Sequence, residues 1–215
     1  CPAGGLLASA GDDQTVRLWS YDGGELAVFD GHDAKVEQLA FSPLGHLLAS
    51  TGGDGRILVW SIYGGDRLRE LRGHTGRVNS MAFSPDGDQL VTGGVDGSVR
   101  VWTVGSGAGQ LLSGHTGPVR AVAFSPIGNA VASASDDRSV RLWKDGDGKR
   151  DVLTGHRRAV YSVAFSPDGQ FLASGGHDGL VQVWRVQDGS SQTLIGHHGI
   201  VWHVAYSPNG EYLAS

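Results

Sequence analysis

Serine or threonine, histidine and aspartate recur together along this sequence, and they are the side-chain types of a nucleophilic triad. Ser50, His74 and Asp96 are examples. In such a triad the imidazole removes the proton from a hydroxyl group, which then attacks the substrate. An enzyme needs its nucleophile once, whereas here equivalent sets recur along the whole chain. The number of copies therefore favours an architectural role for these residues over catalysis.

The histidines that follow a glycine are regularly spaced. His32, His74, His115, His156 and His197 are separated by 42, 41, 41 and 41 positions. Each of the first four lies 28 positions before a tryptophan. A constant period of this length is the signature of one supersecondary unit repeated in tandem.

Within one period, short apolar runs alternate with turn residues. Residues 78–83, 90–92 and 99–102 have the composition of β-strands, and 110–112 form a fourth, more variable run. The turn residues 84–87 (Ser-Pro-Asp-Gly) separate the first two runs, because proline presets φ and glycine tolerates positive φ. With no helical period anywhere, these patterns predict a small four-stranded antiparallel sheet, repeated radially.

The Gly-His, Ser-Pro-Asp-Gly, Leu-Ala-Ser and Asp-Gly-x-Val-Arg-Val-Trp segments at these intervals resemble the blades of WD-repeat (WD40) β-propellers over essentially the whole chain. The sequence departs from the Trp-Asp dipeptide of the family name, since the residues after the tryptophans are Ser20, Ser61, Thr103, Lys144 and Arg185. The resemblance implies an all-β propeller with four-stranded antiparallel blades. About five blades' worth of strands are present.

The resemblance also implies a structural role for the recurring polar residues. In that family a histidine, a hydroxyl residue, an aspartate and a tryptophan form a buried hydrogen-bonded chain within one blade. Such a chain can satisfy every member, because an imidazole donates and accepts while an indole only donates. The four sets are His32, Ser50, Asp54 and Trp60; His74, Thr92, Asp96 and Trp102; His115, Ser133, Asp137 and Trp143; and His156, Ser174, Asp178 and Trp184. The first blade keeps only Ser9, Asp13 and Trp19.

The phase of the repeats predicts an incomplete ring. Naming the strands A to D from the centre outward, residues 1–30 supply strands B, C and D of a first blade, and 196–215 supply a partial repeat with strands A and B. The complete repeats are 31–72, 73–113, 114–154 and 155–195. We expect one propeller domain over 1–215 that occupies at least six blade positions. We further expect it to be a fragment of a longer protein, most simply of a seven-bladed ring.

Function is expected where the repeats differ at one spatial position. In the resembled propellers, three positions of each repeat surround the mouth of the central channel. The first is the residue after the first valine of strand A, and the second lies two residues before that one. The third is the residue before the aspartate of the polar set. The candidate partner-binding residues at these positions are Lys35, Glu37, Arg77, Asn79, Arg120, Tyr161, His177 and Trp202. Tryptophan, tyrosine and arginine are frequent interface anchors. An alternative remains that Tyr161 and Trp202 only pack against neighbouring loops.

Composition argues against several classes of partner. The net charge is −5 and the 17 basic residues are scattered, so we expect no nucleic-acid partner. No run of about 18 apolar residues exists, so we expect no membrane span. We expect no metal or cofactor: residues 145–148 (Asp-Gly-Asp-Gly) resemble the start of a calcium loop, but Lys149 and Arg150 replace a ligand and the required glycine. We read 145–148 as a hairpin turn. No signal peptide is recognisable, and we expect a cytoplasmic protein.

Two functions fit these observations. The first is a non-enzymatic scaffold that binds proteins or peptides through the channel-mouth face. The alternative is a regulatory or recruiting propeller of a larger enzyme, such as a kinase or nucleoside triphosphatase, whose catalytic domain lies outside these residues. A cluster of acidic or histidine residues converging in the channel would instead support catalysis by the propeller itself.

Overall fold

The computed structural model describes residues 1–144 and 150–215, and every regular element in these ranges is a β-strand. The strands form six separate antiparallel sheets, each built from strands consecutive in the chain. The first sheet has three strands, the next four have four strands each, and the last has two. The predicted all-β fold with four-stranded antiparallel blades is confirmed.

The strand bounds follow the repeats. The first sheet holds β1 (Leu6–Ala10), β2 (Val16–Ser20) and β3 (Glu25–Phe29). The second holds β4 (Val36–Phe41), β5 (Leu47–Gly52), β6 (Ile57–Ser61) and β7 (Arg67–Leu71). The third holds β8 (Val78–Phe83), β9 (Gln89–Gly94), β10 (Val99–Thr103) and β11 (Gly109–Leu112).

The second half of the chain continues the pattern. The fourth sheet holds β12 (Val119–Phe124), β13 (Val131–Ser135), β14 (Ser139–Trp143) and β15 (Arg150–Thr154). The fifth holds β16 (Val160–Phe165), β17 (Phe171–Gly176), β18 (Leu180–Arg185) and β19 (Ser191–Ile195). The last holds β20 (Ala205–Tyr206) and β21 (Leu213–Ala214).

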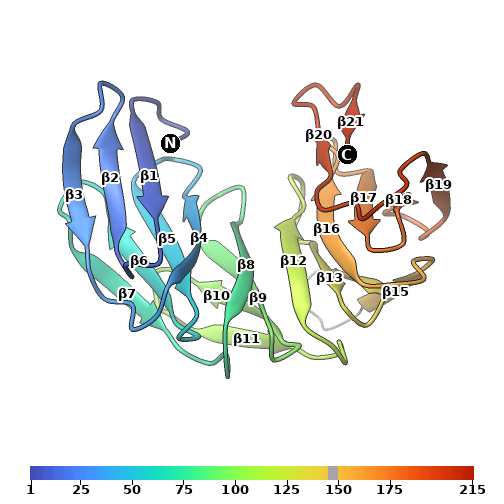
Figure 1. Cartoon of the computed structure of the whole chain (residues 1–215), viewed down its shortest axis with the longest axis horizontal. Coiled ribbons are helices and arrows are strands. Elements are labelled where there is room, and N and C mark those ends of the chain that lie inside the picture. The colour runs from blue at the N-terminus through green and yellow to red at the C-terminus, as the bar shows by residue number, and fades with distance from the viewer. Residues whose placement is uncertain (145–149) are drawn as a thin grey trace.

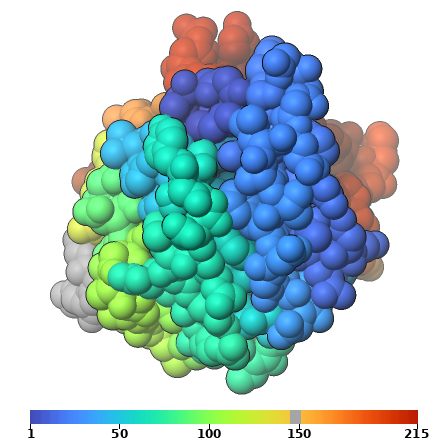
Figure 2. Space-filling model, turned by 90° about the vertical axis from the view of Figure 1, so that its left-hand side faces the viewer, coloured from blue at the N-terminus to red at the C-terminus, as the bar shows by residue number. Residues whose placement is uncertain are grey.

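The sheets stand around a common centre as an open arc (Figure 1). Strands β4, β8, β12 and β16 line the inner side, and β3, β7 and β19 lie at the outer side. The first and last sheets face each other across the opening of the arc, so the incomplete ring predicted from the repeat phase is confirmed. Figure 2 shows the molecule from the side of the first two sheets, whose surfaces lie next to each other there.

Turn residues set the length of each strand. In the third sheet the N–H of Gly87 donates to the carbonyl of Ser84 at 2.9 Å and closes the turn between β8 and β9. Gly87 has φ of +79°, a conformation that side chains disfavour and glycine tolerates. Equivalent glycines with positive φ follow the other Ser-Pro turns, at positions 45, 128, 169 and 210.

Apolar side chains fill the space between successive sheets. Between the third and fourth sheets, Val91, Val99 and Leu112 pack against Val119 and Trp143. Each of the second to fifth sheets thus buries one face against the sheet before it and the other against the sheet after it, as expected for stacked repeats.

The last inner strand, β20, is shorter than the inner strands of the complete sheets. Its apolar run begins at Val201, but pairing is confined to Ala205 with Ala214 and Tyr206 with Leu213. The complete sheets pair the same two strands over five residue pairs, as between β16 and β17. Residues 201–204 keep their place through other contacts: Val201 and Val204 are buried against Ala173 and Val181 of the fifth sheet.

Candidate interaction face

The inner strands carry a β-bulge at the same point in each complete sheet. The pairing register shifts between Val36 and Gln38 in β4, and again at the equivalent points of β8, β12 and β16. The residues left outside the pairing are Glu37, Asn79, Arg120 and Tyr161. A bulge leaves one residue unpaired and redirects its side chain. Four of the eight predicted interaction residues therefore occupy bulges at one end of the inner strands.

Polar contacts connect the first half of this face. The ammonium of Lys35 lies 3.3 Å from Glu37 Oε1, and the guanidinium of Arg77, from the next sheet, lies 3.7 Å from the same atom. Arg77 Nε donates to Asn79 Oδ1 at 2.9 Å. Asn79 Nδ2 in turn donates to the carbonyl of Val119 at 2.7 Å. These contacts span the second, third and fourth sheets without interruption.

Arginine and aromatic contacts connect the second half. Arg120 binds Asp136 with two hydrogen bonds, 2.8 Å from Nε and 2.6 Å from Nη2. The guanidinium carbon of Arg120 lies 5.9 Å from the ring centroid of Tyr161 in the next sheet. Tyr161 stacks on Trp202 with centroids 4.9 Å apart and planes inclined by 12°. His177 lies on the same tyrosine, at 6.0 Å between centroids.

The two aromatic residues differ in exposure. Tyr161 is partly covered by Arg120, His177 and Trp202, so this residue does pack against its neighbours, as the alternative interpretation expects. Trp202 is 67% exposed and stacks against Tyr161. An exposed indole oriented by a stacking neighbour is a suitable surface for a further apolar or cationic group.

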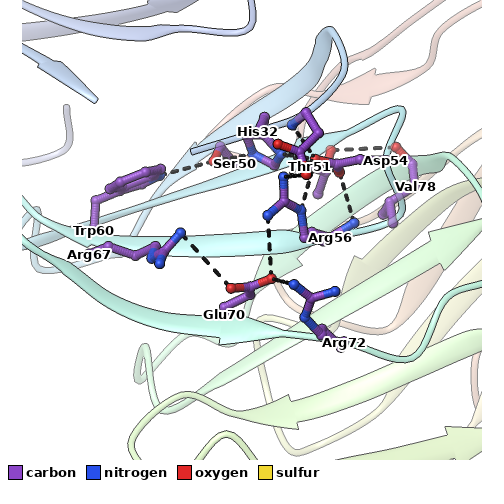
Figure 3. A network of polar contacts seen from close by, with 11 residues as sticks. His32, Ser50, Thr51, Asp54, Arg56, Trp60, Arg67, Glu70, Arg72 and Val78 are labelled. Atoms are coloured by element: carbon purple, nitrogen blue, oxygen red, sulfur yellow. Dashed lines mark hydrogen bonds and ion pairs between the residues drawn. The ribbon is translucent and has the colours of Figure 1, made fainter. Parts of the chain in front are cut away.

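The recurring polar sets form hydrogen-bonded chains inside the four complete sheets. In the third sheet His74 Nδ1 lies 3.1 Å from Asp96, and His74 Nε2 lies 2.8 Å from Thr92 Oγ1. Trp102 Nε1 donates to the same hydroxyl at 2.9 Å. The sets at His32, His115 and His156 have the same connections, with histidine-to-hydroxyl distances of 2.8 Å in each (Figure 3 shows the first).

Two family models match this sequence. A model described as WD domain, G-beta repeat matches residues 1–20 and 23–61, and a model described as IFT122 first beta-propeller matches residues 51–214. The chain belongs to the WD-repeat β-propeller family. Propeller domains of this family generally serve as protein-interaction scaffolds and are generally non-catalytic. A search of curated proteins gave no match.

In this WD-repeat protein the imidazoles of His32 and His74 are neutral near pH 7. Burial lowers the pKa of His32 and of His74, and the neighbouring Asp54 and Asp96 only partly offset it. A neutral ring can donate from Nδ1 to the aspartate and accept at Nε2 from the hydroxyl group. The indole donates to the same hydroxyl oxygen, so every polar group of the chain has a partner.

The aspartates of the network remain ionised because donors surround them. Burial by itself would raise the pKa of Asp96, but N–H groups of Thr75 and Ser98 and the Ser98 hydroxyl outweigh it and lower the pKa to about 2. The pKa of Asp137 is also lowered to about 2, where the Ser139 hydroxyl and N–H outweigh burial. The carboxylates therefore act as fixed acceptors that join the loop before each inner strand to the turn between the two middle strands.

The second blade has an additional ion-pair cluster around Arg56 (Figure 3). Arg56 Nε donates to Asp54 Oδ2 at 3.0 Å, and its Nη1 lies 3.5 Å from Glu70 Oε1. Glu70 also faces Arg72 at 2.5 Å and Arg67 at 3.9 Å. This cluster joins the buried chain of the blade to its outer strand β7.

The hydroxyl groups of the four polar sets are buried and hydrogen-bonded. Ser50, Thr92, Ser133 and Ser174 are each 0% exposed, and each accepts an indole N–H. A substrate therefore has no access to them. Within residues 1–144 and 150–215, no three histidine, cysteine, aspartate or glutamate side chains form a group able to hold a metal ion. The predicted turn at 145–148 and Lys149 lie outside the described residues, as does the side chain of Arg150.

Sequence reasoning missed Asp136, which holds the guanidinium of Arg120. Asp136 lies at one of the positions that vary between repeats, and an acidic residue there, in the same repeat as the basic Arg120, is the signal that the sequence offers. The bulges are also visible in the spacing of apolar residues in the sequence. Val36 and Leu39 are three residues apart, whereas Leu39 and Phe41 are two apart. This break in the period of two recurs in every inner strand and marks an extra residue.

Proposed function

We propose that this WD-repeat arc is a non-enzymatic scaffold that binds proteins or peptides through the face formed by its bulge residues. The observation that supports the proposal is the continuous row of side chains from Lys35 to Trp202, drawn from five successive sheets. The row joins a charged end to an aromatic end. An interface anchor of the kind that carries binding energy is available in Trp202, exposed and oriented by stacking.

The proposal favours protein over nucleic acid as partner. Nucleic-acid binding requires basic side chains that are free to neutralise phosphates. On this face Arg120 is bound by Asp136, and Lys35 and Arg77 both flank Glu37.

Within residues 1–144 and 150–215, the structure has no helix of the length and hydropathy needed to cross a bilayer. We keep a cytoplasmic setting as part of the proposal, as expected from the sequence.

Alanine substitutions at the aromatic end test the proposal. Proteins retained from a native lysate are compared for the unmodified chain, Trp202→Ala and Tyr161→Ala. Tyr63→Ala is the matched control, because Tyr63 is 81% exposed in the turn between β6 and β7, at the opposite end of the strands. We expect both face variants to lose partners that the Tyr63 variant retains, with unchanged circular dichroism. Partner sets identical in all four preparations would remove this face from consideration.

A further inference from the structure

Three arginine side chains of the fourth and fifth sheets have no partner of opposite charge. Arg138 lies in the turn between β13 and β14, and Arg157 and Arg158 lie in the loop before β16. All three residues are exposed. Within residues 1–144 and 150–215, none of their guanidinium groups forms an ion pair or a hydrogen bond with another residue. Their positive charges are therefore available to a ligand.

Arg138 has a backbone conformation that favours glycine. Its φ is +72°, in the left-handed region, where a Cβ atom is disfavoured. Three other sheets have glycine with positive φ at this position of the turn, and the first sheet has glutamine: Gly55, Gly97, Gly179 and Gln14. The fourth sheet thus carries a long cationic side chain there at a cost in backbone strain. Residues held in such conformations cluster at ligand-binding sites.

The repeat brings Arg138 against the loop that carries the other two arginines. A Cβ atom at Gly97 in the third sheet would lie 3.2 Å from the carbonyl oxygen of Gly117, in the loop before β12 of the fourth sheet. Gly55 makes the equivalent approach to the loop before β8. The same step along the arc places the Cβ atom of Arg138 beside Arg158. The three arginines therefore gather where the fourth and fifth sheets meet.

The loop before β16 lacks the acidic residue that neutralises its equivalent in the second sheet. The N–H of Arg157 donates to Asp178 Oδ2 at 2.8 Å, a bond that the other complete sheets also have. In the second sheet the residue at this position is Asp33, whose carboxylate lies 2.7 Å from Arg56 Nη2. In the fifth sheet Leu180 stands in place of Arg56. Arginine thus replaces the acid, and its charge has no internal counterpart.

The carboxylates that adjoin the three arginines are already bound. Asp136, two residues before Arg138, accepts two hydrogen bonds from Arg120. Asp137 and Asp178 accept from histidine and N–H groups of their polar sets, and their side chains are 8% and 5% exposed. This part of the surface therefore presents positive charge, although the net charge of the chain is −5.

We propose that Arg138, Arg157 and Arg158, here called the arginine seam, bind an acidic segment of a partner protein. The inference rests on the proposed function, in that the partner is a protein, and adds the chemistry that the partner brings. Guanidinium groups form charge-assisted hydrogen bonds with carboxylates, and successive acidic residues of an extended segment can reach arginines on both sheets. The seam lies at the same end of the strands as Tyr161, so one partner can contact both.

A short acidic segment fits the arginine seam better than a nucleic acid does. Nucleic acids are bound by basic surfaces that neutralise many phosphates. The other cations of this face are paired with carboxylates: Lys35 and Arg77 with Glu37, and Arg120 with Asp136. The available positive charge is therefore confined to one seam, which suits a few carboxylates.

Fluorescence anisotropy with a defined peptide tests the proposal. The probe is a fluorescein-labelled peptide in which glutamate and serine alternate, and the comparison peptide has glutamine in place of every glutamate. We expect the glutamate peptide to bind the unmodified chain at low ionic strength, and the glutamine peptide to bind at least about tenfold more weakly. Added salt should weaken the binding, because exposed charges are screened.

Three variants locate the site. The combined Arg157→Gln and Arg158→Gln variant should raise the dissociation constant of the glutamate peptide about tenfold or more. Arg138→Gly should raise it about threefold without lowering the temperature of thermal unfolding, because glycine accepts the positive φ. Arg185→Gln is the matched control: Arg185 is exposed at the end of β18, at the opposite end of the strands, and its loss should leave the affinity unchanged.

Three results would overturn the proposal. The first is that the glutamate peptide does not bind, or binds no more tightly than the glutamine peptide. The second is equal affinity of the glutamate peptide for the combined Arg157 and Arg158 variant and for the Arg185 control, which would place the peptide elsewhere. The third is tighter binding of a labelled oligothymidylate through the same arginines, which would assign the seam to nucleic acid.

These outcomes are distinct from those of the alanine test of the proposed function. If Trp202→Ala loses partners from the lysate while the arginine variants bind the peptide normally, the arginine seam alone is wrong. If peptide binding depends on the arginines while lysate partners are unchanged in Trp202→Ala and Tyr161→Ala, the row of bulge residues alone is wrong.

Discussion

At the scale of single residues, Asp96 holds together more groups than any other member of its set. Asp96 accepts from the N–H groups of Thr75 and Ser98, from the Ser98 hydroxyl and from His74. The histidine and hydroxyl residues of the same set make fewer polar contacts. In this arrangement the carboxylate is the central acceptor of the set, which supports the structural role expected for it from the sequence.

Removal of Asp96 should destabilise the protein. Asp96→Ala leaves two backbone donors and an imidazole without an acceptor in a buried site, and we expect a loss of about 1–3 kcal/mol in the free energy of unfolding. Urea denaturation followed by tryptophan fluorescence measures it. Asp30→Ala, on an exposed position, should change the stability by less than about 0.5 kcal/mol. Equal effects of the two substitutions would contradict the network role.

Acid should destabilise the fold in two steps. The folded-state pKa of His32 and of His74 lies below the unfolded value of 6.5, so unfolded chains bind protons first and stability falls as the pH drops below 6.5. The pKa values of Asp96 and Asp137 are about 2 against 3.8 when unfolded, so a second loss follows between about pH 4 and pH 2. Each of these aspartates contributes about 2 kcal/mol near neutral pH. Urea midpoints measured from pH 7 to pH 3 should therefore fall below pH 6.5 and fall again below about pH 4. A constant midpoint would contradict these pKa shifts.

At the scale of the strands, close approach between neighbouring sheets depends on residues without side chains. A Cβ atom at Gly93 in β9 would lie 2.4 Å from Val119 Cγ1 and 2.9 Å from Val122 Cγ1, in the next sheet. Both valines are buried in the cluster between the third and fourth sheets and have no space to move away. Gly93 therefore sets the distance between these two sheets.

Alanine at Gly93 should force the sheets apart. We expect Gly93→Ala to lower the free energy of unfolding by about 1–3 kcal/mol, the usual effect of overpacking a core. Gly105→Ala is the control: a Cβ there meets nothing within 4 Å, and its backbone needs no positive φ. Thermal unfolding of the two variants distinguishes a packing effect from a general effect of losing a glycine, which would lower both transitions alike.

At the scale of the whole molecule, stability is a sum over sheets and the contacts between neighbouring sheets. The second to fifth sheets are each flanked on both sides, whereas the first sheet is covered only by the second. The last sheet contacts only the fifth and has two short strands. Local opening should therefore begin at the two ends of the arc.

Hydrogen exchange followed by mass spectrometry should show this gradient. We expect amides of β1–β3 and of 201–215 to exchange at least about tenfold faster than those of β8–β10, which lie in the middle of the arc. The outer strand β11 is a partial control, because it belongs to a central sheet but lies at its edge. Uniform protection across all sheets would show that the arc opens only as one unit.

The sequence alone determined the repeat, the strand order, the incomplete ring and the fold family, because these depend on patterns within about 40 residues. Turn residues such as Pro85 and Gly87 act on their own neighbours, and the period between histidines is visible without coordinates. The roles of the eight residues on the channel-mouth face and of the polar sets remain predictions that the experiments above address.

Only the tertiary structure decided how residues one repeat apart meet. The stacking of Tyr161 on Trp202, the approach of Arg77 to Glu37 and the bond from Asn79 to Val119 each join neighbouring sheets. Such contacts depend on the angle between sheets and on bulges that redirect single side chains, and both result from packing across the whole inter-sheet core.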